Sequence, residues 1–230
     1  MSAETPSVPG SPTPPIEEGP FDSLHLRADV VTVIMALYVV VLGLAVSDAL
    51  TRLTLTFTVS TLLASLTMFT LVLPFFHGGM MFMYRTYVNA GFKPKGSAFV
   101  RVRPLVDSLM LFASAIVFYV MSALIVFPAY FVISLLALFV LDVIWVAYTI
   151  RHPTDIPVKT EWTWLKLDLF MIFVLALSGL SWFSLTEKYV TPVIGLVVVL
   201  GGALARTFVD YWNNLDEFFP ERITGLPKRV

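Results

Sequence analysis

Six long apolar stretches dominate the chain, and shorter polar segments separate them. A helix needs about 20 apolar residues to cross the hydrocarbon core of a bilayer, which is about 30 Å thick. We therefore expect an all-α, polytopic integral membrane protein with six transmembrane helices. The expected spans are residues 29–49, 53–76, 107–127, 129–149, 165–184 and 190–209.

The third and fourth spans lie in one apolar stretch that is too long for a single crossing. Pro128, in the sequence FPAY, divides this stretch, because proline disfavours helical geometry at the residue that precedes it. Two spans joined by a tight turn are therefore predicted. The six spans then form three hairpins packed into one bundle.

Positive charges are concentrated on one side of this predicted bundle. Of the 15 Lys and Arg residues in the chain, only Arg52 and Lys188 fall on the opposite side. Because cytoplasmic segments retain Lys and Arg, both termini should be cytoplasmic, in a multi-pass protein of the plasma (inner) membrane. The basic loop after the second span should contact anionic membrane lipids. This loop contains Arg85, Lys93, Lys95, Arg101 and Arg103.

The composition argues against several classes of function. The 230-residue chain is 57% hydrophobic, and its formal net charge of -1 gives no indication of nucleic-acid binding. It contains no cysteine, which excludes disulfides and thiolate chemistry. The sequence also lacks the H-E-x-x-H, G-x-S-x-G and P-loop motifs. We therefore expect no cofactor and no metal site, and nothing in the sequence favours an enzyme.

Two terminal segments flank the predicted membrane domain, which covers residues 28–210. Residues 1–27 are rich in proline and should form a disordered cytoplasmic tail. Residues 211–230 contain aromatic residues at helical spacing, which indicates an amphipathic cytoplasmic tail. Either tail could bind a cytoplasmic protein partner. The spans could also assemble into a homo-oligomer with a pore on its symmetry axis.

Ionisable side chains within the apolar spans are the main functional candidates, because each costs about 2.5 to 3.5 kcal/mol at a helix centre. Asp142 is the clearest case, and it should have a partner in the bundle interior. Arg206 is the natural partner, since the fourth and sixth spans run in the same direction. Asp210 follows Arg206 by one helical turn on the same face. Asp168, at the start of the fifth span, is a further candidate that also complements the helix dipole.

His77 lies where the second span reaches the cytoplasmic side, in the sequence PFFHGG. Its imidazole could pass protons or sense pH, or it could simply satisfy a carbonyl freed by Pro74. A stripe of hydroxyl side chains follows the same span. The stripe forms either a packing seam between helices or the wall of a hydrated path to His77. It comprises Thr54, Thr58, Thr61 and Ser65.

Four tryptophans near the ends of the spans are expected to be interfacial anchors: Trp162, Trp164, Trp182 and Trp212. Taken together, these patterns favour a small channel or transporter for protons or small ions, with its polar cluster in the cytoplasmic half of the membrane. The alternative is a non-transporting membrane anchor, sensor or partner subunit. A third class, an intramembrane enzyme, would require a water-accessible His77 beside Asp142.

Overall fold

A computed structural model describes residues 24–89, 98–152, 159–184 and 190–214. All the regular structure in these ranges is helical, and a π-helical segment, η1, continues the second helix. The helices are α1 Leu24–Leu55, α2 Val59–Met83, η1 Tyr84–Asn89, α3 Ala98–Leu124, α4 Pro128–Arg151, α5 Lys159–Ser184 and α6 Val190–Asn213.

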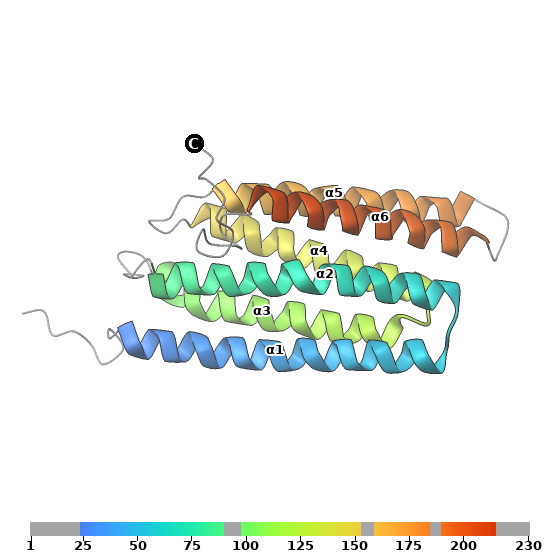
Figure 1. Cartoon of the computed structure of the whole chain (residues 1–230). Helices are drawn as coiled ribbons and strands as arrows, with labels where there is room; N and C mark the ends of the chain where they lie inside the picture. Colours follow the sequence, from blue (N-terminus) through green and yellow to red (C-terminus); the bar gives the residue numbers. More distant parts are fainter. Residues whose placement is uncertain (1–23, 90–97, 153–158, 185–189, 215–230) are drawn as a thin grey trace, which may run out of the picture.

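The helices lie side by side along one axis and alternate in direction (Figure 1). α1 begins and α6 ends at the same end of the bundle, which we call the terminal end; the opposite end is the far end. The expectation of an all-α chain with six long apolar helices is confirmed, because each of the six is long and apolar enough to cross a membrane. Their outer surfaces expose large apolar side chains, including Val33, Leu73, Leu109, Ile133, Phe173 and Phe208.

The turns at the far end follow from local sequence. Residues 125–127 separate α3 from α4, and Pro128 takes the first position of α4, where a missing N–H costs nothing. The predicted break at Pro128 is therefore confirmed. Before α2, Thr58 is an N-cap whose hydroxyl accepts a hydrogen bond from the Thr61 N–H at 3.1 Å.

The predicted hydroxyl stripe along one helix is wrong. Thr54 belongs to α1, which ends at Leu55, and Thr58 precedes α2 as its cap. Thr61 and Ser65 alone of the four are buried on α2. The prediction failed because capping by Thr58 starts a new helix within a segment whose hydroxyl spacing suggested one continuous face.

Helices that are consecutive in the chain run antiparallel to each other. The most extensive helix–helix contacts, however, include pairs of helices that are not consecutive in the chain. α1 packs mainly against α3, and α2 packs mainly against α6, while α4, α5 and α6 pack in sequence order. α2 and α4 face each other with little direct contact. The space between these two helices is where the candidate site lies.

Three side chains of η1 reach three different helices. The Tyr84 hydroxyl lies 3.1 Å from that of Thr32 on α1. Arg85 donates to Glu161 of α5 at 2.6 Å, and the Tyr87 hydroxyl donates to Asp107 of α3. A π-helical turn carries an extra residue compared with an α-helical turn, so side chains that follow it are re-aimed. The segment therefore holds the end of α2 against its neighbours.

Two residues of the predicted basic loop are helical rather than in a loop. Arg85 belongs to η1 and pairs with Glu161 of α5, and Arg103 belongs to α3 and pairs with Asp107 at 3.4 Å. Contact of the basic segment with lipid head groups stays a prediction. Lys93, Lys95 and the side chain of Arg101 lie outside the described residues.

The predictions for the two tails fall largely on residues that the structure does not describe. Residues 1–23 and 215–230 are outside the described ranges. The segment from Leu24 to Arg27, expected to be part of the tail, is the first turn of α1. Residues 211–213 complete α6 rather than starting a separate segment.

Substitutions at two neighbouring glycines on α6 would test how α5 packs against α6. A Cβ atom on Gly202 would lie 2.9 Å from a methyl group of Val174, whereas a Cβ on Gly201 would meet nothing within 4 Å. Gly201→Ala should stabilise the protein by up to about 1 kcal/mol through helix propensity. Gly202→Ala should lose that gain to overpacking, which costs about 1–3 kcal/mol. Thermal unfolding in detergent should rank the Gly202 variant below the Gly201 variant, and equal midpoints would contradict this packing.

Candidate functional site

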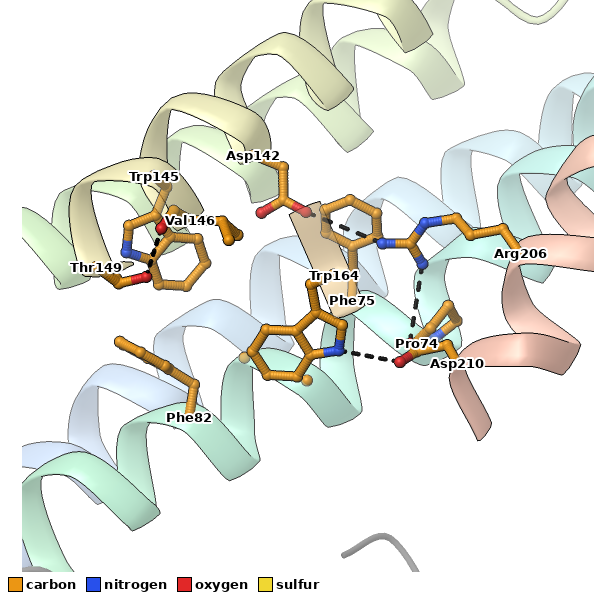
Figure 2. Close-up of a pocket in the computed structure, with 12 residues that line it drawn as sticks. Pro74, Phe75, Phe82, Asp142, Trp145, Val146, Thr149, Trp164, Arg206 and Asp210 are labelled. Carbon is orange, nitrogen blue, oxygen red and sulfur yellow. Dashed lines mark hydrogen bonds and ion pairs between the residues drawn. The ribbon is translucent and has the colours of Figure 1, made fainter. Parts of the chain in front are cut away.

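A cavity of about 30 Å³ lies between α2 and α4 in the half of the bundle nearer the terminal end (Figure 2). This volume has room for about two water molecules. One face of α2 and one face of α4 form its main walls, with residues at helical spacing, and α5 and α6 complete it. Its lining consists of Pro74, Phe75, Gly78, Gly79, Phe82, Asp142, Trp145, Val146, Thr149, Trp164, Arg206 and Asp210.

Small residues on α2 allow neighbouring side chains to approach its backbone beside this cavity. A Cβ on Gly78 would lie 3.6 Å from the ring of Trp164, an ordinary contact distance, so the indole packs directly over the glycine backbone. Pro74, one turn earlier, has no N–H to donate within the helix. The cavity wall is therefore also the part of α2 with the weakest helical constraint.

Arg206 is the centre of the polar cluster at this cavity. Its guanidinium donates through Nε and Nη2 to Oδ1 of Asp168, at 3.2 and 2.8 Å. Both side chains are buried, with relative exposures of 4% and 0%. The guanidinium also lies 5.1 Å from the ring centre of Phe75 and 5.4 Å from that of Phe139. These cation–π contacts, together with the ion pair, fix its position.

Two more carboxyl groups surround the same guanidinium at longer distance. Asp142 Oδ2 lies 3.9 Å from Nη2 of Arg206, and Asp210 Oδ2 lies 4.0 Å from Nη1. Asp210 is also held through Oδ1, which accepts from the Trp164 indole at 2.9 Å and from the Asn214 amide at 2.7 Å. Figure 2 shows Asp142, Arg206 and Asp210 converging on the cavity from α4 and α6.

The cluster has more acidic than basic groups. Arg206 can balance one of the three carboxylates, which leaves two negative charges uncompensated if all three are ionised. Asp142 Oδ2 and Asp168 Oδ1 approach the same nitrogen, Nη2 of Arg206, at 3.9 and 2.8 Å. Among the described residues, no partner is within hydrogen-bonding distance of the buried Nη1 of Arg206, and no donor is within that distance of Asp168 Oδ2. The site therefore has capacity for additional protons or hydrogen-bonding molecules.

Four of the residues expected from the sequence thus meet in one cluster: Asp142, Asp168, Arg206 and Asp210. Their pairing differs from the expectation, because Arg206 makes its close contact with Asp168 and only a long one with Asp142. A position near the start of a helix suggested that Asp168 was interfacial. The α5 helix instead begins nine residues earlier, at Lys159, which places Asp168 inside the bundle.

His77 lies beside the cavity rather than in its lining. Its Nδ1 is 2.5 Å from the hydroxyl of Tyr211 on α6, which joins α2 to α6 next to Asp210. The buried hydroxyl residues Thr61 and Ser65 do not lead to His77, because the apolar side chains of Met68 and Leu71 are buried on α2 between them.

The sequence did not predict the contacts of Trp164 and did not single out Asp107. Trp164 lines the cavity and donates to Asp210, so its indole faces the bundle interior, whereas Trp162 and Trp212 are about half exposed. Asp107 is fully buried and accepts hydrogen bonds from Tyr87 and Trp145. The signal that could have identified it is an arginine at position 103, one turn earlier in an apolar span.

No family model matches the chain, and neither a curated protein nor a solved structure shows significant similarity to it. Among the residues that the structure describes, no group of three or more His, Cys, Asp or Glu side chains has the arrangement of a metal site.

The unequal distances around Arg206 predict unequal effects of removing each carboxylate. Asp168→Asn should destabilise the protein by about 3–5 kcal/mol, because it leaves a buried guanidinium without its close partner. Asp142→Asn should change stability by about 1 kcal/mol or less, because it also removes one like charge from the cluster. Thermal unfolding of both variants in detergent would check this order, and a larger loss for Asp142→Asn would contradict it.

Proposed function

We propose that the chain crosses the plasma (inner) membrane six times, with the terminal end of the bundle in the cytoplasm. Two observations support this arrangement. Each helix exposes large apolar side chains on the outside of the bundle, where lipid could cover them. In the sequence, all Lys and Arg residues except Arg52 and Lys188 belong to the two ends of the chain, to the α2–α3 and α4–α5 connections, or to the helix halves next to them, which are the segments expected in the cytoplasm.

The function that the site supports best is a small channel or transporter for protons or small ions. The observation that carries this proposal is that two carboxyl groups, those of Asp142 and Asp168, approach the same nitrogen, Nη2 of Arg206, at 3.9 and 2.8 Å. One guanidinium balances only one carboxylate charge, and a second buried negative charge beside it is costly, which favours uptake of a proton by one of the two carboxyl groups. The cluster would then hold a proton between α4 and α5.

A purely structural role explains the pair of Arg206 and Asp168 but not the additional carboxylates. One aspartate is enough to compensate a buried guanidinium, and every further buried charge costs free energy. Asp142 nevertheless faces the cavity, and no N–H or O–H group among the described residues donates to it at hydrogen-bonding distance. A carboxyl group so placed can exchange a proton with water in the cavity.

The cavity extends from the cluster towards the terminal end, whereas the buried side chains on the other side of the bundle are mostly apolar, with a few small hydroxyl groups among them. Protons could therefore reach the cluster from the proposed cytoplasmic side, and release to the other side would require a rearrangement of helices. The fully or almost fully buried apolar residues on that side include Met68, Leu71, Leu135, Leu138, Met171, Leu175, Leu196 and Val199.

The α2 helix is the element best suited to such a rearrangement. Pro74 lacks the N–H that would complete the helical ladder, and Gly78 and Gly79 follow within about one turn. All three line the cavity beside the cluster. Bending of α2 at this segment would change the distance between Phe75 and Arg206, and so the exposure of the carboxylates.

Proton flux through proteoliposomes tests this proposal. Vesicles that contain the purified protein and a trapped pH-sensitive dye should equilibrate an imposed pH gradient faster than empty vesicles when valinomycin and K⁺ clamp the membrane potential. Asp142→Asn should reduce the flux to the level of empty vesicles, because the amide cannot take up a proton. Separate measurements of Na⁺ flux and of K⁺ flux, each under its own imposed gradient, would identify a small-ion cargo.

The matched control for this experiment is Asp48→Asn. Asp48 is paired with Arg52 at 2.8 Å and accepts from Ser122 at 2.9 Å, in the far half of the bundle away from the cavity. Its replacement should leave the flux unchanged. Wild-type flux in a folded Asp142→Asn protein, or no flux of any of the three ions in the wild type, would contradict the proposal and favour a structural network.

A further inference from the structure

A second buried polar cluster lies beside the cavity, and the proposed transport function does not use it. Asp107 on α3 is 0% exposed. Its carboxylate accepts a hydrogen bond from the Tyr87 hydroxyl of η1 and another from the Trp145 indole of α4, the latter at 2.8 Å. Nε of Arg103 approaches the same carboxylate at 3.4 Å. Three elements of the bundle are thus joined through one side chain.

Trp145 belongs both to this cluster and to the cavity. Its N–H is directed to Asp107, while its ring lines the cavity and meets Phe82 edge to face, with ring centres 5.1 Å apart and planes at 77°. Phe82 and Trp145 each lie about one turn closer to the terminal end than Gly78 and Asp142 respectively. Figure 2 shows both aromatic side chains on the side of Asp142 that faces away from Arg206, and the residue order places this side towards the terminal end.

We propose that Asp107 is a positioning residue that holds the Trp145 ring against Phe82 and so controls the access of water and small solutes from the terminal end to Asp142. The hydrogen bond from the indole to a carboxylate fixes the rotation of the ring. The contact with Phe82 is weaker than a hydrogen bond to a charged group and cannot fix it alone.

The surroundings of Asp107 suit this positioning role. Tyr87 and Arg103 hold the carboxylate from two directions, and Arg103 also donates to the backbone carbonyl of His152, just beyond the end of α4. The orientation of Trp145 thus depends on the relative positions of η1, α3 and the end of α4. The inference concerns access to the cavity only, so it does not depend on whether protons cross the membrane.

Cysteine labelling can measure this access, because the chain contains no cysteine and any single introduced thiol reports alone. Gly78→Cys places the probe in the cavity on the inner side of the aromatic pair, where a Cβ has ordinary contact distances. The purified protein in detergent is treated with a charged methanethiosulfonate reagent, and mass spectrometry gives the rate of modification.

Asp107→Leu should raise the labelling rate of the Gly78→Cys probe on the order of tenfold, the factor that corresponds to the loss of one hydrogen bond to a charged group. Trp145→Phe should give a similar increase, because it keeps an aromatic ring but removes the N–H. Combining Trp145→Phe with Asp107→Leu should give no further increase in the labelling rate of the Gly78→Cys probe. Asp107→Asn retains an oxygen that can accept from the indole, so its rate should stay near that of the parent.

A second probe separates positioning from general loosening of the fold. Thr149→Cys lies in the cavity lining on the terminal side of the pair, and its labelling rate should be the same in all backgrounds. An unchanged Gly78→Cys rate in both Asp107→Leu and Trp145→Phe would overturn the proposal. Equal acceleration of both probes, or an Asp107→Asn rate as high as that of Asp107→Leu, would overturn it as well. Trp145→Phe keeps the test valid if Asp107→Leu does not fold.

Discussion

The buried ion pair between Arg206 and Asp168 is the interaction on which the arrangement of the site depends. It joins α5 to α6 in the interior of the bundle, and two phenylalanine rings flank the guanidinium. A buried guanidinium without a close partner would be costly, so this pair must form if α6 is to place Arg206 inside. Once it has formed, the longer approaches of Asp142 and Asp210 follow from the positions of α4 and α6.

The same pair determines which carboxylates are available for chemistry. Oδ1 of Asp168 accepts a hydrogen bond from Arg206, and Oδ1 of Asp210 accepts hydrogen bonds from Trp164 and Asn214. Asp142 has no comparable donor, although it lies against the cavity. The protein thus combines, around a single positive charge, one carboxylate in a close ion pair, one held by neighbouring donors and one that faces the cavity.

Much of the fold was predictable from the sequence, because six apolar stretches and one proline break determine the number and order of the helices. The meeting of Asp142, Asp168, Arg206 and Asp210 was only partly predictable. Hydropathy identifies which charges lie in apolar segments, but the pairing depends on which helices become neighbours. Asp107 was missed because it lies at the edge of an apolar stretch, where a charge normally needs no partner.

The π-helical segment η1 gives the bundle a further property. Over four residues, from Tyr84 to Tyr87, its side chains contact α1, α5 and α3. The contacts of three helices thus depend on one short segment. An insertion or deletion of one residue within η1 would rotate the side chains that follow it by roughly a quarter of a turn relative to those that precede it, so the three contacts could not all be kept. The segment should therefore tolerate substitution far better than insertion or deletion.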